Sequence, residues 1–503
     1  MILTPKEMGD AERVAIADGR VESGYRLMCN AGAAVVAEML RRFADAQSFD
    51  VLCGPGNNGG DGYVIARLLH EGGHVVRLWA LGRPAGDIDA ARALAECPVP
   101  ARPIAGYRPA VGSVVVDALF GGGLARAIDG EAARVIATVN ESGLPVAAVD
   151  LPSGVPGATG RPLGPCIKAR LTVTFMCRRP GQVLYPGRYL CGEVVVADIG
   201  LPRRALPETK LRENAPALWL ERLPVPAVES HKYDRGHVGV FSGSPAQTGA
   251  ARMSALGSAR VGAGAVTVLS PSSAIAANAA HLTSVMLRKA DGMADILAFI
   301  AERRPRAFVF GPGLDPKPKV AAFLVDLLGE IGRTKAETTI VVDASAITAA
   351  SADPRRLFAA ANGKNAPALV LTPHSGEFAR LFPDIASEDG VSKVEQSRAA
   401  AKRANGIVVF KGSDTVIADP DGQAVVNTNG TSWLATAGSG DVLAGMIAGL
   451  CAQGMPAFEA ACAAVWIHAE AGGRHGPGLI AEDLPGLLPA VLAELIRACE
   501  NQP

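Results

Sequence analysis

LATAGSGDVLAG, residues 434–445, places a run of small residues directly in front of an apolar segment. The glycines around Ser439 predict a tight turn, and the apolar residues from Val442 to Leu450 predict the helix that follows it. The first turn of a helix has backbone N–H groups without intrahelical partners and carries the positive end of the helix dipole, so it can bind an anion. A carboxylate there is unfavourable beside a phosphate, but it is well placed to take a proton from a hydroxyl group. Asp441 is therefore a candidate general base, and the alternative is that it only caps the helix.

The rest of the second half repeats the order of strand, polar turn and helix. Short apolar segments end at Asp343, at His374 and at Lys411, and helical spacing resumes after the first two. This alternation predicts an α/β domain with a mostly parallel sheet. A cation that directly follows a buried strand suits a nucleotide phosphate, although Lys411 could also be a solvated charge. His374 is a candidate ligand contact or a packed histidine, and Asp343 is balanced between a helix cap and a site residue.

The first half has three strand ends with polar residues. The strand Phe49–Cys53 runs into a glycine-rich loop, and two further strands end at Asp117 and at Asp150. Ligands of open parallel sheets bind beyond the carboxyl ends of the strands, although a single Asp there is often only a cap for the next helix. Asn58, Asp117 and Ser153 would offer amide, carboxylate and hydroxyl oxygens, which suit a hard cation and not a transition metal.

Length and composition limit the classes of protein to consider. The chain has 503 residues, which predicts two or three domains, and 49 basic residues balance 49 acidic ones. A net charge of zero argues against nucleic acid as a partner, and no apolar run is long enough to span a membrane. The nine scattered cysteines and the lack of a signal-peptide pattern predict reduced thiols and a cytoplasmic location.

The first half resembles the NAD(P)H-hydrate epimerase domain over about residues 1–202. The resemblance rests on Gly54-Pro55-Gly56-Asn57-Asn58-Gly59-Gly60-Asp61-Gly62, Asp117-Ala118-Leu119-Phe120-Gly121, Asp150-Leu151-Pro152-Ser153-Gly154, Leu171-Thr172-Val173-Thr174-Phe175 and Ala197-Asp198-Ile199-Gly200-Leu201-Pro202. It implies a Rossmann-like three-layer α/β/α sandwich, a potassium ion held by Asn58, Asp117 and Ser153, and Asp150 as the acid/base. It also implies a substrate site formed by Asn57, Asn58, Gly59, Gly60, Asp61, Gly121, Gly122, Gly123, Leu124, Ala125, Arg126, Ala127 and Asp150. Arg179 departs from the lysine expected of the family but keeps the charge.

The second half resembles the ADP/ATP-dependent NAD(P)H-hydrate dehydratase, which has a ribokinase-like fold, over about residues 230–492. The resemblance rests on Lys232-Tyr233-Asp234-Arg235-Gly236, Thr248-Gly249-Ala250, Gly311-Pro312-Gly313-Leu314, Leu371-Thr372-Pro373-His374-Ser375-Gly376-Glu377-Phe378, Lys411-Gly412 and Gly438-Ser439-Gly440-Asp441. It implies Asp441 as the catalytic residue, and it implies substrate contacts by Ala250, Gly313, His374 and Asp441. It further implies nucleotide contacts by Lys411, Gly412, Ser413, Asp414, Thr415 and Gly440. The sequence departs from the family at Gln247, where Tyr is usual, and at Trp433-Leu434, where Gly-Met is expected.

Both resemblances together predict a bifunctional enzyme that repairs hydrated NADH and NADPH. A proline-rich segment near Pro224 places the boundary between residues 1–222, the epimerase domain, and residues 223–503, the dehydratase domain. The first would interconvert the R and S hydrates, and the second would dehydrate the S hydrate at the expense of ADP or ATP with magnesium. We expect the chain to form a homo-oligomer. The alternatives are a ribokinase-like small-molecule kinase with a non-catalytic N-terminal binding domain, and a first half that only binds protein or RNA.

Overall fold

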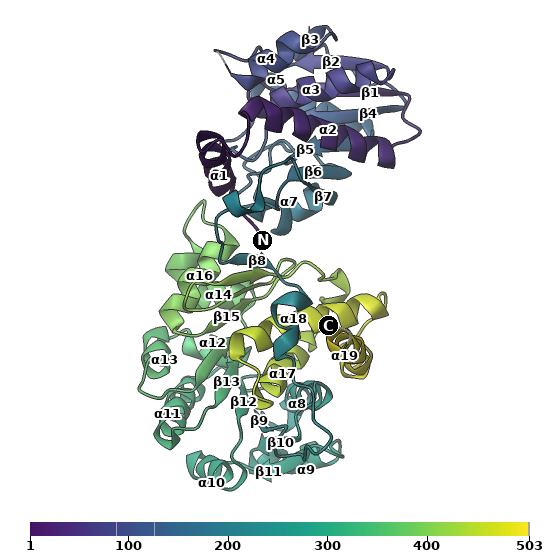
Figure 1. Cartoon of the computed structure of the whole chain (residues 1–503). Coiled ribbons are helices and arrows are strands. Elements are labelled where there is room, and N and C mark those ends of the chain that lie inside the picture. Colours follow the sequence, from purple (N-terminus) through teal and green to yellow (C-terminus); the bar gives the residue numbers. More distant parts are fainter. Residues whose placement is uncertain (87, 125, 501–503) are drawn as a thin grey trace. The chain divides into compact units, whose positions relative to one another are not determined.

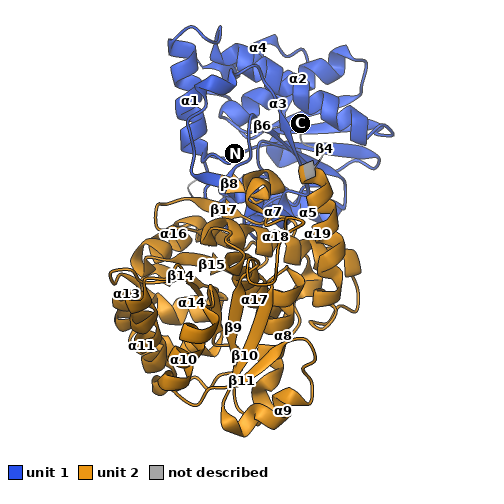
Figure 2. Ribbon diagram, turned by 60° about the horizontal axis from the view of Figure 1, so that its bottom comes forward, with its two compact units in different colours: residues 1–211 blue, residues 212–503 orange. Residues whose placement is uncertain are grey.

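The computed structural model describes residues 1–86, 88–124 and 126–500. The chain folds as two compact units, Met1–Leu211 and Arg212–Pro503, which are coloured separately in Figure 2. Each unit has its own sheet and its own hydrophobic core.

The sheet of the first unit is parallel throughout and has the strand order β3-β2-β1-β4-β5-β6-β7. The chain builds outward from β1 in one direction and then returns to place β4 on the other side of β1. This reversal is the topological switch point at which such sheets bind ligands. The strands are β1 Ser48–Cys53, β2 Val76–Ala80, β3 Ala101–Pro103, β4 Ser113–Ala118, β5 Val146–Val149, β6 Leu171–Phe175 and β7 Glu193–Ala197.

Helices cover both faces of this sheet, because successive strand residues point to opposite sides. Val116 of β4 packs with the core under α1 to α4, and its neighbour Val115 packs with the core under α5. The predicted three-layer sandwich is thereby confirmed. The helical segment predicted from Met8 to Arg42 is two helices, because the chain turns between Asp18 and Ser23. The helices are α1 Pro5–Ala17, α2 Gly24–Arg42, α3 Asn57–Glu71, α4 Asp89–Glu96, α5 Gly130–Ser142, α6 Pro180–Val183 and α7 Gly187–Leu190.

The sheet of the second unit has the order β11-β10-β9-β12-β13-β14-β15-β16-β17-β8. Its strands β9 to β15 are parallel, and β16 is antiparallel to both neighbours. The strands are β8 Leu211–Glu213, β9 His237–Phe241, β10 Ala265–Ser270, β11 Met286–Lys289, β12 Ala307–Phe310, β13 Thr339–Val342, β14 Ala368–Leu371, β15 Ile407–Phe410, β16 Val416–Ala418 and β17 Ala424–Val426.

Two groups of helices enclose this second sheet (Figure 1). Val309 of β12 packs with α8 and α17 to α19, whereas Phe308 contacts Phe299 of α10, and Phe310 stacks on Phe323 of α11. The helices are α8 Thr248–Arg260, α9 Ile275–Ala279, α10 Met293–Arg303, α11 Pro318–Thr334, α12 Ser345–Ala350, α13 Pro354–Ala361, α14 Ser375–Leu381, α15 Pro383–Ala386, α16 Lys393–Ala404, α17 Ser439–Ala452, α18 Ala457–His475 and α19 Leu484–Glu500.

The division between the units comes earlier in the chain than the predicted one after Arg222. Residues 212–222 belong to the second unit because Trp219 and Leu220 are buried in its core. Asn214 fixes this segment, since its amide donates to Asn427 Oδ1 at 3.0 Å and to the carbonyl of Cys462 at 2.8 Å. The proline-rich composition predicts a linker, but Trp219, Leu220 and Leu223 between the prolines are core residues.

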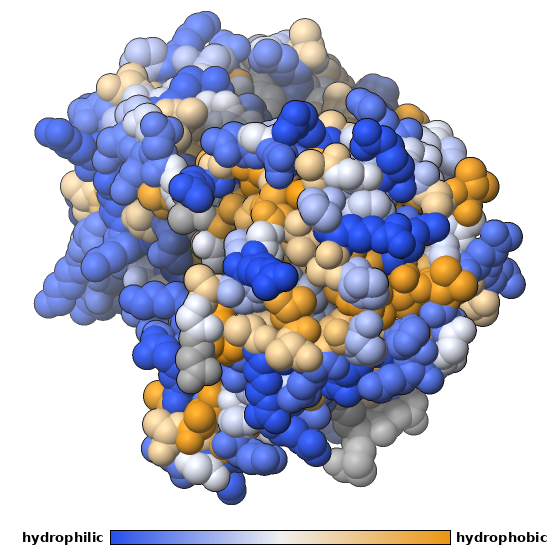
Figure 3. Space-filling view, turned by 90° about the horizontal axis from the view of Figure 1, so that it is seen from above, coloured by the Kyte–Doolittle hydropathy of each residue, from blue (hydrophilic) through white to orange (hydrophobic). Residues whose placement is uncertain are grey.

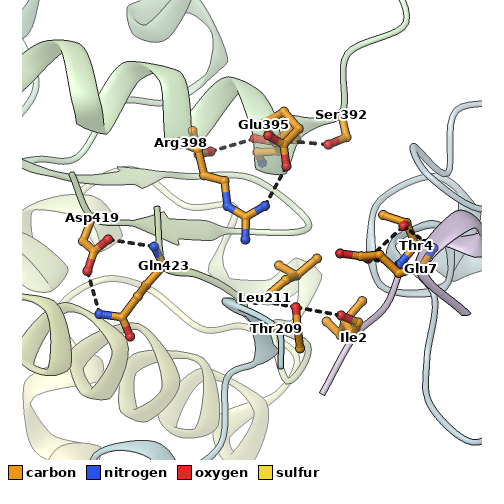
Figure 4. A network of polar contacts seen from close by, with 12 residues as sticks. Ile2, Thr4, Glu7, Thr209, Leu211, Ser392, Glu395, Arg398, Asp419 and Gln423 are labelled. Carbon is orange, nitrogen blue, oxygen red and sulfur yellow. Dashed lines mark hydrogen bonds and ion pairs between the residues drawn. The ribbon is translucent and has the colours of Figure 1, made fainter. Parts of the chain in front are cut away.

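Short-range polar contacts define several element ends, and Figure 4 shows some of them. Thr4 begins α1 with a capping box, in which Thr4 and Glu7 each accept a hydrogen bond from the other's backbone N–H. Asp419 accepts from the backbone and the side chain of Gln423, both at 2.8 Å, and so closes the β16–β17 hairpin.

Figure 3 shows a face on which hydrophilic side chains surround smaller apolar areas. Within residues 1–86, 88–124 and 126–500, no helix combines the length and the apolar character needed to cross a bilayer.

Candidate functional site

The glycine-rich loop after β1 packs against the loop after β4. A Cβ on Gly54 would lie 1.8 Å from the carbonyl oxygen of Leu119, and a Cβ on Gly59 would lie 1.9 Å from the carbonyl oxygen of Gly54. Only glycine allows these approaches. The amide oxygen of Asn58 lies against Gly121, so the two loops meet at the switch point of the sheet.

Asp117 and Ser153 form a buried hydrogen-bonded pair beside these loops. The Asp117 carboxylate accepts from the Ser153 hydroxyl at 2.6 Å and from its backbone N–H at 2.7 Å. Burial raises the pKa of Asp117 to about 6, although these hydrogen bonds oppose the shift. No cationic side chain contacts this carboxylate within the described residues.

The resemblance implies that this pair and Asn58 together bind potassium. The amide oxygen of Asn58 would be the cation ligand, because the amide nitrogen carries only N–H donors; that nitrogen is buried without a hydrogen-bond partner among the described residues. Asn58, Asp117 and Ser153 offer only hard oxygen ligands, and the buried carboxylate has no protein cation beside it. The residues present therefore fit a monovalent or divalent hard cation.

Asp150, at the end of β5, is held by contacts from four directions. Its backbone has a φ of 61°, a conformation that costs a non-glycine residue about 1–3 kcal/mol. Its carboxylate accepts from Thr174 Oγ1 at 2.9 Å and from the Gly122 N–H at 3.2 Å. Its carbonyl accepts from Gln182 Nε2 at 2.6 Å, and Arg179 Nη2 lies 3.5 Å from its Oδ1. A carboxylate that several neighbours contact, on a strained backbone, is consistent with a functional role.

Asp150 acts electrostatically on two further carboxyl groups. Burial raises the pKa of Glu12 on α1, while the charge of Arg179 lowers it and the charge of Asp150 raises it. Burial also raises the pKa of Asp61 well above its usual range, and Asp150 and Glu12 add to this shift. Asp150 thus lies within electrostatic reach of two carboxyl groups whose pKa values are raised by burial.

The loop from Gly121 to Ala127 only partly reaches this cluster. Gly122 contacts Asp150, whereas Leu124 packs on the core under α5, and Arg126 and Ala127 are exposed. Ala125 lies outside the described residues.

In the second unit, α17 begins at Ser439, and Gly438 is its N-cap with a φ of 89°. Asp441 therefore lies inside the first turn and is not the cap, contrary to the alternative considered from the sequence. Burial raises the pKa of Asp441 to about 6, with the charge of Asp343 adding to the shift and Lys411 opposing it. Asp441 lines a cavity of about 490 Å³ together with Gly438 and Ala250.

Lys411 and Asp343 form an ion pair next to this turn, with 2.7 Å between Nζ and Oδ1. A Cβ on Gly440 would lie 3.3 Å from the Lys411 ammonium. The carboxyl ends of β13 and β15 thus bring Asp343 and Lys411 to the start of α17. Asp343 lies in the site because it pairs with Lys411. The sequence alone had left it balanced between a helix cap and a site residue.

His374 and Gly313 lie near this centre but do not line its cavity. His374 is the N-cap of α14, accepts from the Gly376 N–H at 3.0 Å through Nδ1 and is exposed. The Lys411 N–H donates to the Pro373 carbonyl at 2.8 Å, which brings the His374 turn beside Lys411. A Cβ on Gly313 would lie 3.5 Å from the Cβ of Ala250.

The loop after Lys411 is held internally. Asp414 is buried and accepts from Lys393 Nζ at 2.7 Å, and the Thr415 hydroxyl accepts from the Gly412 N–H at 3.2 Å. Asp414 thus shapes the loop through Lys393. Ser413 is exposed.

Several residues that contact the candidate sites were not indicated by the sequence motifs. Glu12 and Gln182 come from segments outside the glycine-rich loops, and Arg179 stands out only as a departure from the family. His468 of α18 lies with its Nε2 3.0 Å from the Ser439 carbonyl, and Ser254 of α8 donates to the Asp441 carbonyl at 2.8 Å. Burial lowers the pKa of His468 to about 4, so this histidine is neutral at pH 7 and helps to hold the first turn of α17.

Comparison with known families assigns both units. Residues 24–181 match the family described as YjeF-related protein N-terminus, and residues 238–488 match the family described as NAD(P)H-hydrate dehydratase. A solved ribokinase-like superfamily protein from Enterococcus faecalis superimposes with a TM-score of 0.50 at 24% identity and covers 58% of this chain and 98% of its own. The ribokinase-like fold of the second unit is thereby confirmed.

Full-length relatives carry one common name. The bifunctional NAD(P)H-hydrate repair enzyme of Moorella thermoacetica is 35% identical over 99% of this chain and 98% of its own length. The enzyme of the same name from Coxiella burnetii is 34% identical over 95% and 96%, respectively. These relatives favour repair over the alternative of a small-molecule kinase with a non-catalytic first domain. The chain belongs to the family of bifunctional NAD(P)H-hydrate repair enzymes, with an epimerase in its first half and a dehydratase in its second.

Proposed function

We propose that Asp441 is the general base of a nucleotide-dependent dehydration in the second unit, and that Asp150 is the acid/base of epimerisation in the first. The observation that carries the proposal is the position of Asp441. Its carboxylate lines the 490 Å³ cavity at the start of α17, with a pKa raised to about 6. A carboxylate with such a pKa is ionised at pH 7 and is still basic enough to accept a proton.

The chemistry explains why a nucleotide is needed. The hydrate carries a hydroxyl on the carbon beside the ring nitrogen, and hydroxide is a poor leaving group. Asp441 would take the hydroxyl proton while the oxygen forms a bond to the terminal phosphorus of ADP or ATP, and the bond from that phosphorus to the rest of the nucleotide breaks. The ring nitrogen lone pair then expels phosphate, and a proton leaves the neighbouring ring carbon, which restores the dihydronicotinamide.

Other residues of the second unit would bind the two substrates. The N–H groups of Ser439 and Gly440 at the start of α17 would hold the transferred phosphoryl group, and Lys411 would exchange its contact with Asp343 for a nucleotide phosphate. Gly412, Ser413 and Thr415 would contact the nucleotide, with Asp414 shaping the loop, and magnesium would arrive with its phosphates. Ala250, Gly313 and His374 would contact the hydrate.

In the first unit, Asp150 would protonate and deprotonate the hydrate as its epimers interconvert. Asn57 to Asp61 and the loop from Gly121 to Ala127 would surround the substrate. Asn58, Asp117 and Ser153 would hold potassium, which when bound supplies positive charge beside the buried Asp117 carboxylate.

A direct assay tests the proposal. The purified chain is mixed with hydrated NADH and either ADP or ATP, and the absorbance of the dihydronicotinamide is followed. We expect the absorbance to return only when a nucleotide is present, with one phosphate released for each NADH formed. A stable phosphorylated hydrate, or recovery without a nucleotide, would contradict the proposal.

We also propose a cytoplasmic location and a homo-oligomeric state. The nine cysteines lie in the described part of the chain and form no disulfide there, which suits a reducing compartment. Light scattering of the purified chain tests the oligomeric state, and a mass near 51.7 kDa would contradict it.

A further inference from the structure

The cavity that Asp441 lines contains Arg252, for which the described residues provide no ion-pair partner. Arg252 lies on the first turns of α8, and its guanidinium lies back toward the helix start, about 4.0 Å from a Cβ built on Gly249. Its Nε is buried and has no hydrogen-bond partner, and none of the described residues forms a salt bridge with it. An unpaired guanidinium that is partly removed from water is costly, so this side chain is suited to an anion that enters the cavity.

The described residues around Arg252 favour binding of a phosphate group over an ion pair with a protein carboxylate. Glu482 lines the same cavity but makes no ion pair with Arg252 within the described part of the chain. Thr283 and Ser284 also line the cavity and are exposed, and their hydroxyls make no hydrogen bond to a described residue. One guanidinium, two free hydroxyls and the N-terminal turn of α8 are donors of the kind that bind phosphate oxygens.

We propose that Arg252 binds a phosphate group of the hydrated dinucleotide and thereby orients the hydrated ring toward Asp441. This inference rests on the proposed role of Asp441, because it assigns the other end of the substrate in the same cavity. The volume of about 490 Å³ is within the range of small-molecule sites, so one phosphate and the hydrated ring can share it. Arg252 is a binding and positioning residue, since it touches no reacting atom.

The substrate has two kinds of phosphate group that a guanidinium can bind. The pyrophosphate is present in hydrated NADH and hydrated NADPH, whereas the 2′-phosphate is present only in the latter. The experiment therefore measures KM and kcat of dehydration for the S epimer of each hydrate, at saturating nucleotide, in the wild-type chain and in Arg252→Gln. If Arg252 contacts the pyrophosphate, KM rises about 10-fold or more for both hydrates; if it contacts the 2′-phosphate, KM rises only for hydrated NADPH.

The control is Arg260→Gln, which removes an exposed arginine at the end of the same helix, outside the cavity. We expect Arg260→Gln to leave KM unchanged. We expect Arg252→Lys to fall between wild type and Arg252→Gln, because it keeps the charge and loses the planar fork. In Arg252→Gln, kcat should fall together with the rise in KM, because the hydrated ring is less well oriented toward Asp441, whereas the KM for the nucleotide should change less than about twofold.

Unchanged KM values for both hydrates in folded Arg252→Gln would overturn the proposal, and so would an equal rise in the KM for the nucleotide. Thermal unfolding verifies folding, and if Arg252→Gln is unfolded, the KM of Arg252→Lys decides in the same way. Failure of the function assigned to Asp441 gives a different result from failure of the Arg252 proposal. In that case Asp441→Asn would dehydrate the hydrate normally, whatever the Arg252 variants do.

Discussion

Asp441 combines two properties that a general base needs, namely access to the cavity and a raised pKa. Because only the ionised form accepts a proton, dehydration should be slow below pH 6 and should rise as the pH passes about 6. The measurement is kcat/KM for the S hydrate between pH 4.5 and 8, because this ratio reports the free enzyme. Lys411 lowers the pKa of Asp441, so the rising limb should move to higher pH in Lys411→Ala. A flat profile in this range would mean that another group accepts the proton.

Lys411 is also expected to bind the nucleotide. Its ammonium already has one carboxylate partner, Asp343, so a phosphate must compete with or share that contact. Lys411→Ala should weaken nucleotide binding by about 1.5–3 kcal/mol, the range of hydrogen bonds to charged groups. Titration calorimetry with ADP and ATP measures this change. An unchanged affinity would assign Lys411 to the neutralisation of buried Asp343 alone.

At the scale of elements, the start of α17 is fixed by its close packing on α8. A Cβ on Gly445 would lie 2.0 Å from the Ser254 carbonyl, and Ser258 Oγ donates to the Gly445 carbonyl at 2.8 Å. Gly445→Ala should therefore force the helices apart and destabilise the chain by about 1–3 kcal/mol. Gly473→Ala on α18 is the matched control, because nothing lies within 4 Å of its Cβ position. We expect the control to be neutral or stabilising, since alanine favours helix over glycine. Thermal unfolding of both variants is the measurement, and equal melting temperatures would contradict the account of this packing.

The loops at the switch point of the first sheet make a second prediction about elements. Because Asn58, Asp117 and Ser153 offer only hard oxygen ligands, epimerisation should respond to potassium and should be insensitive to a zinc chelator. Epimer exchange is measured in potassium chloride and in choline chloride at equal ionic strength. Equal rates in the two salts would count against the cation site.

The elements that carry a local sequence signal were predictable. Apolar strands that end in Asp117, Asp150 and Asp343 show their place in the sheet, because polar residues follow buried runs at its carboxyl edge. Pairings between distant segments were not predictable, since the ion pair of Lys411 with Asp343 joins positions 68 residues apart. The same holds for Gln182, which binds the carbonyl of Asp150. A single sequence contains the residues of such pairs but not the register that joins them. The unit boundary was misplaced for a related reason, since the composition around Trp219 does not reveal its burial.

At the scale of the whole molecule, one chain holds two sites with related tasks. If Asp441 is the general base, only one epimer would present its hydroxyl to it, and the epimerase would make the other epimer available for repair. In the proposed function each activity depends on a carboxylate in its own unit, Asp150 in the first and Asp441 in the second. The central claim is therefore that the two activities can be removed one at a time.

The most direct measurement follows both epimers by chromatography in Asp441→Asn and Asp150→Asn, with ADP or ATP present. Asp441 is not a helix cap, and burial raises its pKa, so its charge is unfavourable to folding at pH 7 and Asn should not lower the melting temperature. We expect Asp441→Asn to lose about 10²–10⁴-fold in dehydration rate while epimer exchange is unaltered. Asp150→Asn should dehydrate the S hydrate at the normal rate while the R hydrate accumulates. Near wild-type dehydration by folded Asp441→Asn, or loss of both activities in either variant, would contradict the account.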